Sequence, residues 1–375
     1  MDIAISRAMM PDEQRIALTP AGVQSLTSAG HTVYVDHEAG LSAGFTDNDF
    51  NAAGARIVYH PDEIYSRGDL LVTVDGVPEA AQRLLRPGQI ICGFLHLTML
   101  PQRRLAALAA TRVTTISYEL IQCDSGELPV LESMSEITGR LLPQLAAHLL
   151  ETQSGGRGTL LAPIPGIPSA EVVILGAGVV GINAAYGFTA WGVQTTVLDH
   201  NIDHLRLCER FCWGHVTTQL STQSAITHAV QFADVLIGAV HVPGSCAPQL
   251  VSKQQVAMMK PRSVIIDVAI DQGGCIATSH PTTLHDPTYM AEGVLHYAVP
   301  NIPSAVVRTA AHALNNALLP YIQVIAEGGL DGAIAQGSDL ARGIGLVAGR
   351  PATPQIAAQL DATSLQTATQ RATIR

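Results

Sequence analysis

The chain has 375 residues, which is enough for two domains of ordinary size, each with its own hydrophobic core. With 47% apolar and 14% charged residues, its composition is typical of a globular protein. The formal net charge of −10 argues against nucleic acid as the main partner, because binding to phosphates needs clustered Lys and Arg. The sequence has no uninterrupted apolar run of about 18 residues, and its N-terminus has no basic segment followed by an apolar stretch. We therefore expect a cytoplasmic protein without a membrane partner.

Residues 1 to about 130 alternate short apolar strands with helical patterns, which predicts an α/β domain of its own. The predicted strands are Ile3–Ser6, Thr32–Val35, Leu70–Val74, Gln89–Phe94 and Val113–Ser117, and the predicted helices are Pro20–Ala29 and Pro101–Ala110. A long segment with helical spacing, Met134–Thr152, follows. It contains Gly139 and Pro143, which predict a kink or a break there.

Residues 171–199 read as a strand, a glycine-rich turn, a helix and a second strand that ends in Asp199. Gly176 permits the tight turn, Gly178 allows a pyrophosphate to approach the backbone, and Gly181 allows close packing of the helix on the strand. The unpaired N–H groups at the helix N-terminus favour an anion. The whole unit therefore predicts a dinucleotide site, although the same glycines could make a tight turn in some other doubly wound domain.

Asp199 favours NAD over NADP, because a carboxylate pairs with free ribose hydroxyls and repels a 2′-phosphate. Three positively charged or titratable residues, His200, His204 and Arg206, lie close to Asp199 in sequence, so NADP stays an alternative cofactor.

Two later strands, Val235–Ala239 and Ser263–Val268, continue this second α/β set, and a second long helix is predicted at Ala305–Ala326, with no breaker before Pro320. We expect a discontinuous substrate domain, 1–133 plus 306–375, and an NAD-binding Rossmann domain, 134–305. The expected class is α/β, with two Rossmann-like domains linked by long helices, the second a doubly wound parallel sheet that binds the dinucleotide. The last fifteen or so residues are expected to be disordered.

The six cysteines form no C-x-x-C pair. Cys208 and Cys212 could supply half of a metal site, but no second pair with zinc-like spacing is present. We therefore expect buried free thiols and no metal.

With these pieces in place, the chain resembles the alanine dehydrogenases and the related nucleotide-binding alpha subunit of proton-translocating pyridine nucleotide transhydrogenase. The resemblance covers most of residues 1–325. It rests on P-D-E-Q-R-I-A-L-T-P-A-G-V, G-F-L-H-L, Y-E, M-S-E-I-T-G-R-L, I-G-A-V-H-V-P-G and D-V-A-I-D-Q-G-G-C, in this order along the chain.

The resemblance implies reversible, NAD-dependent oxidative deamination of an amino acid, which is L-alanine in the alanine dehydrogenases. Arg15 matches the arginine that binds the substrate carboxylate, a role that suits a planar fork of donors. His96 matches the general acid and base, and Asp271 matches the acid that orients the reacting water or amine near the nicotinamide. Asp267 is expected to be structural.

The expected cofactor contacts are a set of backbone and side-chain positions that surround the glycine turn: Gly176, Ala177, Gly178, Val179, Val180, Gly181, Asp199, Val240 and Ser135. The family segment after I-G-A-V-x-V-P-G usually carries lysines, and residues 244–249 have none, which predicts weaker NAD binding. The resemblance also implies a homo-oligomer, either a hexamer or a dimer.

At one position the chain departs from the pattern of the family. The relatives have K-x-K-E-P where this chain has T-V-D-G-V-P, so Asp75 stands where a substrate-binding lysine is expected. Lys253 and Lys260 are the only lysines, so none from the first 250 residues can take the role. Reversing a charge in a partly dehydrated site predicts poor binding of pyruvate.

Three interpretations follow from this departure. The substrate carries an amino or guanidino group that Asp75 accepts; or alanine activity survives because an arginine such as Arg67 or Arg83 moves in; or the protein binds dinucleotide without catalysis. The presence of Arg15, His96 and Asp271 together argues against the last.

Overall fold

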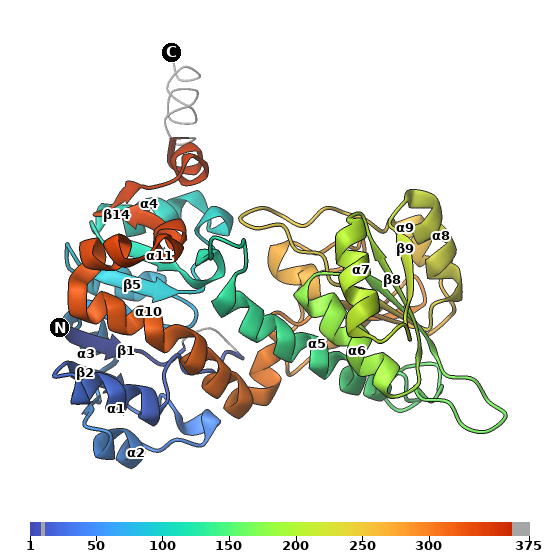
Figure 1. Ribbon diagram of the computed structural model, residues 1–375, viewed down its shortest axis with the longest axis horizontal. Coiled ribbons are helices and arrows are strands. Elements are labelled where there is room, and N and C mark those ends of the chain that lie inside the picture. The colour runs from blue at the N-terminus through green and yellow to red at the C-terminus, as the bar shows by residue number, and fades with distance from the viewer. Residues whose placement is uncertain (9–11, 362–375) are drawn as a thin grey trace. The chain divides into compact units, whose positions relative to one another are not determined.

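The computed structural model describes residues 1–8 and 12–361 and divides into two compact units (Figure 1). Unit 1 contains Met1–Met134 together with the chain from Val306 onward, and unit 2 is Ser135–Ala305. Each unit is a mainly parallel sheet with helices, which confirms the predicted α/β class with two Rossmann-like domains. Two long helices, α5 (Pro129–Leu149) and α10 (Val307–Gln336), lie where the chain enters and leaves unit 2.

The sheet of unit 1 has six parallel strands in the order β3-β2-β1-β4-β5-β6, extended by two antiparallel strands, β14 and β15. The strands are β1 (Asp2–Ile5), β2 (Thr32–Asp36), β3 (Arg56–Val58), β4 (Leu70–Val72), β5 (Ile90–Gly93), β6 (Thr114–Ser117), β14 (Ile344–Val347) and β15 (Arg350–Pro351). The helices are α1 (Pro20–Ser28), α2 (Asp47–Ala52), α3 (Pro61–Arg67), α4 (Gln102–Ala110), α10 and α11 (Ser338–Gly343), and the short 3-10 turns are η1 (Leu41–Ala43), η2 (Glu79–Leu84), η3 (Leu97–Met99) and η4 (Tyr118–Leu120). Each of the five strands predicted in this part overlaps an observed one, within one or two residues at either end.

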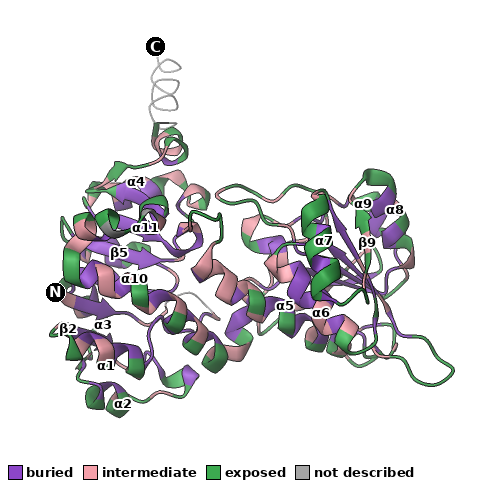
Figure 2. Ribbon diagram, viewed as in Figure 1, coloured by how far each residue is buried: buried purple, intermediate pink, exposed green. Residues whose placement is uncertain are grey.

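The central strands of both sheets are buried, whereas β9, β12 and β15 at the sheet edges are partly or largely exposed, and many exposed residues lie on the outer turns of the helices (Figure 2). In unit 1 the core residues come from strands and from helices far apart in sequence, for example Ile64 of α3, Leu105 of α4 and Leu346 of β14. Strands buried on both faces explain why the sequence shows continuous apolar runs instead of alternation.

The C-terminal part of the chain is fastened to the N-terminal part through Asn315 of α10. Its Oδ1 atom accepts hydrogen bonds from the Thr19 N–H at 3.0 Å and from the Thr19 hydroxyl at 3.1 Å. Thr19 is also the N-cap of α1, where its hydroxyl accepts from the Gly22 N–H. Gly22 has no side chain to obstruct Asn315, so the two helices can approach closely.

The sheet of unit 2 repeats the same order: β9-β8-β7-β10-β11-β13 are parallel, and β12 is antiparallel at the edge. The strands are β7 (Glu171–Leu175), β8 (Gln194–Asp199), β9 (Thr217–Leu220), β10 (Val235–Gly238), β11 (Val264–Asp267), β12 (Thr288–Ala291) and β13 (Val294–Tyr297). The helices are α6 (Val179–Ala190), α7 (Ile202–Phe211), α8 (Gln223–Phe232) and α9 (Lys253–Val256), with the 3-10 turns η5 (Val268–Gln272) and η6 (Ile302–Val306). This order is that of a dinucleotide-binding Rossmann sheet.

The prolines in the two long helices do not end them. Helix α5 continues through Pro143, so the break expected there is wrong. The Pro143 ring lies against Gly187 of α6, where a Cβ atom would be only 2.8 Å from it, and this packing helps to offset the hydrogen bond that proline cannot donate. Helix α10 likewise continues through Pro320 and departs from helical geometry only at Gly329, whose φ is +64°. The predicted C-terminal disorder falls on 362–375, outside the described residues.

No helix in the described part of the chain is long and apolar enough to cross a membrane.

A buried histidine makes the stability of unit 2 depend on pH. His296 of β13 is fully buried, with Nε2 2.7 Å from the Thr278 hydroxyl and Nδ1 3.0 Å from the Val294 carbonyl oxygen. Burial lowers its pKa from the ordinary value. The unfolded chain therefore takes up this proton first, at about pH 6.5, and the free energy of unfolding decreases as the pH falls through that value.

We expect His296→Gln to flatten this decrease between about pH 7 and pH 5. Urea unfolding followed by tryptophan fluorescence measures it, since Trp191 and Trp213, the only two tryptophans, both belong to unit 2. His215→Gln, at an exposed position of the same unit, is the control and should keep the wild-type slope. Equal slopes for the two variants would contradict the assignment.

Candidate active site

In unit 1 the strand order reverses between the neighbouring strands β1 and β4, since β1 is followed by β2 on one side and β4 by β5 on the other. Ligands of open α/β sheets bind at this topological switch point. The segment Thr73–Asp75 follows β4, and the stretch from Phe94 to His96 follows β5, the next strand along. The Phe94 N–H donates to the Val74 carbonyl at 2.8 Å, so the two segments lie side by side. Asp75 and His96 are thus both at the binding edge of unit 1.

Arg15 is held in a buried ion pair with Glu13. Its Nε donates to Glu13 Oε1 at 2.8 Å and its Nη2 donates to Oε2 at 2.6 Å, and the arginine is only 4% exposed. The guanidinium also lies over the Phe94 ring, 5.6 Å from the ring centre. Glu13 therefore holds the guanidinium group of Arg15 in one orientation. Among the described residues Nη1 has no hydrogen-bond partner, so this nitrogen can still donate to the carboxylate of a ligand.

His96 follows β5 in the left-handed conformation, with φ +42° and ψ +45°. Its backbone N–H donates to Glu119 Oε1 at 2.8 Å, and its ring stacks on Phe94 with 6.4 Å between ring centres. The ring is 44% exposed, which leaves it able to exchange a proton with a ligand or with solvent. Arg15 and His96 thus both contact the Phe94 ring, and in this way unit 1 brings these two predicted site residues near one side chain.

Asp75 is half-buried, and its Oδ1 atom is shielded from solvent. Its negative charge reaches Tyr65 of α3: burial chiefly raises the pKa of the Tyr65 hydroxyl, and the charges of Asp36 and Asp75 raise it further. The Asp75 carboxylate, at the position where the resemblance predicts a lysine, therefore follows the carboxyl end of β4 and is half-buried.

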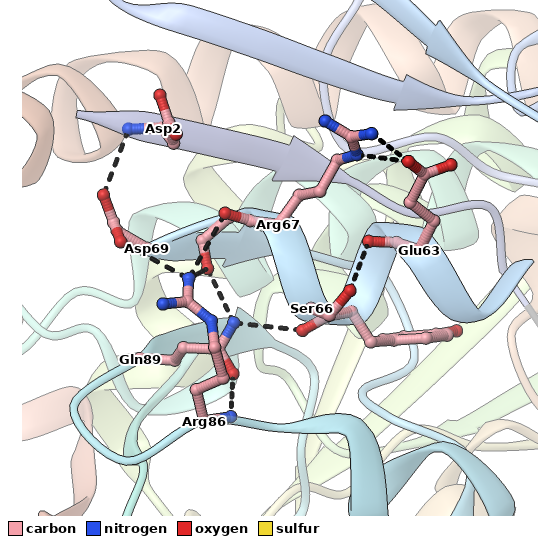
Figure 3. A network of polar contacts seen from close by, with 9 residues as sticks. Asp2, Glu63, Ser66, Arg67, Asp69, Arg86 and Gln89 are labelled. Carbon is pink, nitrogen blue, oxygen red and sulfur yellow. Dashed lines mark hydrogen bonds and ion pairs between the residues drawn. The ribbon is translucent and has the colours of Figure 1, made fainter.

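Arg67 cannot replace the missing lysine, because it lies at the opposite end of β4. Its guanidinium pairs with Glu63 one turn back on α3, and the carbonyl groups of Arg67 and Gly68 accept hydrogen bonds from Arg86 (Figure 3). This network surrounds the amino end of β4, whereas Asp75 follows its carboxyl end. The other proposed substitute, Arg83 in η2, is exposed.

In unit 2 the glycine turn lies at the corresponding switch point, between β7 and β10. Gly176 has φ +106°, and a Cβ there would lie 2.5 Å from the Ala239 carbonyl oxygen. A Cβ on Gly181 would collide with the carbonyl oxygen of Gly176. A Cβ on Gly178, in contrast, would meet no protein atom within 4 Å, so the protein itself gives no steric reason for that glycine.

Helix α6 begins directly after this open space. Its N-cap is Gly178, which has no side chain to accept from the first N–H groups, and the helix has 12 residues. Open space at Gly178 and an uncapped helix N-terminus fit the pyrophosphate of a dinucleotide, which needs close backbone approach and N–H donors. Ala177, Val179 and Val180 complete the turn.

Asp199 ends β8 with both carboxylate oxygens turned toward the glycine turn and α7. Oδ2 accepts from the Ala177 N–H at 2.7 Å and Oδ1 accepts from the Asn201 N–H at 2.7 Å. The Nδ1 atoms of His200 and His204 lie 3.4 and 3.6 Å from Oδ1. Since each oxygen has a second lone pair, the carboxylate can still accept from ribose hydroxyls, which favours NAD.

The remaining predicted residues of unit 2 follow β10 and β11 at the same edge. Val240 follows β10 after one intervening residue, Ala239. Gln272 holds the loop that comes next, because its side chain accepts from the Val242 N–H at 3.1 Å and donates to the Val242 carbonyl oxygen at 2.9 Å. Asp271 precedes Gln272 in η5 and is exposed. Asp267 is buried, where its carboxylate accepts from the N–H groups of Cys275 and Ile276.

Ser135 lies in α5, one turn before Gly139. A Cβ on Gly139 would lie 2.5 Å from the Val180 carbonyl oxygen, so this part of α5 packs against the first turn of α6. Ser135 is half-buried beside that contact.

Cys208 and Cys212 are buried free thiols, as predicted, whereas Cys246 is exposed. Within residues 1–8 and 12–361, no group of three His, Cys, Asp or Glu side chains could hold a metal ion. The two lysines pair with carboxylates of unit 2, Lys253 with Glu292 and Lys260 with Asp234.

Two family models match the chain: the N-terminal domain of alanine dehydrogenase/PNT over residues 4–138, and the C-terminal domain of the same family over residues 143–353. The chain belongs to the alanine dehydrogenase/PNT family. It is 43% identical to an alanine dehydrogenase of Methanococcus maripaludis over 93% of this chain and 94% of the relative. It is also 43% identical to an alanine dehydrogenase of Mycobacterium tuberculosis, over 96% and 97%.

Solved structures of the alanine dehydrogenase/PNT family have the same fold. An L-alanine dehydrogenase superposes with a TM-score of 0.90 and 40% identity, covering 96% of this chain and 99% of the other. A transhydrogenase from Sinorhizobium meliloti superposes with a TM-score of 0.78 over 94% and 99%. At 20% identity the latter shows the shared fold alone.

Sequence reasoning missed three residues that contact the predicted site residues Arg15 and His96 in unit 1: Glu13, Phe94 and Glu119. Each belongs to a motif that carried the resemblance, but nothing in those motifs indicates which partner the side chain contacts. Glu13 pairs with Arg15 two positions away, whereas Glu119 reaches His96 from the next strand.

Two glycine substitutions should have opposite effects. Gly178→Ala should leave the unfolding temperature unchanged, because its Cβ enters open space at an ordinary φ of −76°, but should weaken NAD binding at least about tenfold, a loss of about 1.4 kcal/mol. Gly181→Ala should instead lower the unfolding temperature. Calorimetric titration with NAD and thermal unfolding measure the two effects; wild-type affinity in Gly178→Ala would contradict the assignment of the pyrophosphate site.

Breaking the buried ion pair should destabilise unit 1. Glu13→Ala leaves the buried Arg15 charge without its carboxylate, at an expected cost of about 3 to 5 kcal/mol. Glu63→Ala, which removes the partly exposed pair with Arg67, should cost less than about 1 kcal/mol. Urea unfolding followed by circular dichroism compares the variants, and a similar small loss in both would show that the buried pair is not needed for folding.

Proposed function

We propose that this protein is an NAD-dependent dehydrogenase that oxidatively deaminates an α-amino acid, and that reduces the corresponding imine or 2-oxo acid in reverse. The observation that carries the proposal is the buried Glu13–Arg15 fork beside His96 at the carboxyl edge of unit 1. Such an arrangement offers a fixed carboxylate-binding cation next to a group that can exchange a proton near neutral pH. The full-length similarity to alanine dehydrogenases supports this reaction class.

Each proposed site residue has one task. Arg15 donates from its remaining edge to the substrate carboxylate and so fixes the orientation of the α-carbon. His96 accepts the proton that the substrate nitrogen or the attacking water gives up, and returns it in the reverse direction. Asp271 orients that water or the amine. Bound NAD, held by the glycine turn and Asp199, supplies the acceptor for the hydride that leaves the α-carbon.

The substrate we propose carries an amino or guanidino group in addition to its α-amino group. Asp75 lies at the switch point of unit 1, and a partly buried carboxylate there favours a cation and disfavours a second carboxylate. Arg15 would still hold the α-carboxylate. This specificity sets the chain apart from relatives with lysine at position 75.

Genuine L-alanine dehydrogenase is the second candidate, because identity of about 40% extends over nearly the full length of both chains. The third interpretation, binding without catalysis, has less support, since a silent homologue has no need to keep Arg15 in a buried fork.

A substrate panel and one charge reversal distinguish the candidates. Purified protein with NAD is offered alanine, lysine, ornithine and arginine, and NADH formation is followed by absorbance. We expect the basic amino acids to give the higher kcat/KM. In Asp75→Lys, kcat/KM for alanine should rise at least about a hundredfold, since restoring one partner of such an ion pair contributes about 3 to 5 kcal/mol.

Asp69→Lys is the matched control, because it reverses a charge at the opposite end of the same strand, where Asp69 is exposed and near Arg86. It should leave the preference unchanged. Alanine turnover by the wild type at an ordinary enzymatic rate, with no gain in Asp75→Lys, would identify an alanine dehydrogenase and refute the altered specificity.

We further propose that the protein works as a homo-oligomer, either a hexamer or a dimer, in the cytoplasm. Its cysteines are free thiols in the described structure, which suits a reducing compartment. Light scattering coupled to size-exclusion chromatography determines the number of subunits.

A further inference from the structure

Glu119 is a buried carboxylate whose role the proposed reaction does not yet explain. It lies in η4, directly after β6, and is 7% exposed. Its Oε1 accepts a hydrogen bond from His96, but Oε2 is buried without a hydrogen-bond partner among the described residues. A buried carboxylate oxygen without a partner is costly, so this charge calls for a compensating positive group.

His96 is the group that faces this carboxylate. Its backbone is held in the left-handed conformation, which is unfavourable for residues other than glycine, and the hydrogen bond from its N–H to Oε1 at 2.8 Å opposes relaxation. The ring Nδ1 lies 3.8 Å from the same Oε1. One carboxylate therefore fixes the backbone of His96 and lies beside its ring.

We propose that Glu119 is a positioning residue for His96, which holds the histidine in its left-handed conformation and stabilises the positively charged ring. This inference rests on the proposed function. In the oxidation, the substrate ammonium loses one proton to Nε2 of His96 while the α-carbon gives up a hydride, which leaves an iminium group on the substrate. The ring then carries protons on both nitrogens, with Nδ1–H directed at Glu119, until its extra proton passes to solvent.

The other charged groups at this edge of unit 1 do not take this role. Arg15 lies across the Phe94 ring, and its charge is already balanced by Glu13 in a two-point contact. Asp75 follows β4, and its charge acts on Tyr65. Glu119 is the carboxylate that contacts the backbone of His96 and lies within 4 Å of its ring.

Three substitutions test the proposal on the full chain. Glu119→Gln keeps an oxygen that can accept from the His96 N–H but removes the charge. Glu119→Asp keeps the charge on a shorter side chain and provides a second variant if the first folds poorly. Glu127→Gln, an exposed glutamate after the same strand, is the matched control.

The first measurement needs no substrate. Nuclear magnetic resonance follows the protonation of the His96 ring with pH, and His96→Gln identifies its signal among the 14 histidines. In Glu119→Gln we expect the ring to be protonated at a pH at least about half a unit lower than in wild type, because a negative charge about 4 Å away is lost. Glu119→Asp should stay close to wild type, and Glu127→Gln should not differ from it.

The second measurement is the pH dependence of turnover with the substrate that the panel identifies. In Glu119→Gln, kcat should fall about tenfold with little change in KM, and the acid limb of kcat/KM should move to lower pH together with the ring titration. An unchanged ring titration in both Glu119 variants would overturn the inference, whatever the activity. A shifted titration without turnover of any amino acid would leave the inference standing and refute the proposed function.

Discussion

The parallel strand order 3-2-1-4-5-6, which both units share, is the constraint on which the proposed chemistry depends. Because the connections from the two central strands run to opposite faces of the sheet, side chains at their carboxyl ends are left uncovered by helices. In unit 1 this position belongs to Asp75, with His96 on the adjoining strand. In unit 2 it belongs to the glycine turn and Val240. One topology thus provides a substrate edge and a dinucleotide edge.

Charge balance explains how unit 1 keeps reactive groups in partly buried positions. Arg15 is almost fully buried but stays charged, because Glu13 binds it at two points. Asp75 and Glu119 add negative charge at the same edge, and no lysine lies in the first 250 residues. The edge therefore combines one fixed cation, proposed to bind an α-carboxylate, with the carboxylates of Asp75 and Glu119. The carboxylate at position 75 is the physical basis for proposing a basic amino acid as substrate.

The three glycines of the β7–α6 turn in unit 2 show that a glycine required by the protein's own backbone can be distinguished from one required by a ligand. Gly176 and Gly181 are required by the backbone, since any side chain there would meet a carbonyl group. Gly178 is required by nothing in the protein, because its surroundings are open. A glycine with no steric reason, directly before an uncapped helix, is best explained by a ligand that approaches the backbone closely.

The sequence by itself determined the features that depend on near neighbours. The turn, helix and terminal acid of residues 171–199 form one local unit, and the central strands of both sheets are short apolar runs, so both could be predicted. Edge strands such as β9, whose sequence is mostly polar, were not predicted. Pro143 misled the prediction of a break, because helix α5 continues through it and its ring packs against Gly187. Only the tertiary structure decided that Glu119 contacts His96 and that Asp75 lies at a switch point while Arg67 lies at the far end of β4. These outcomes depend on which strands become neighbours, and burial and pairing of charges follow from that arrangement, which local sequence does not encode.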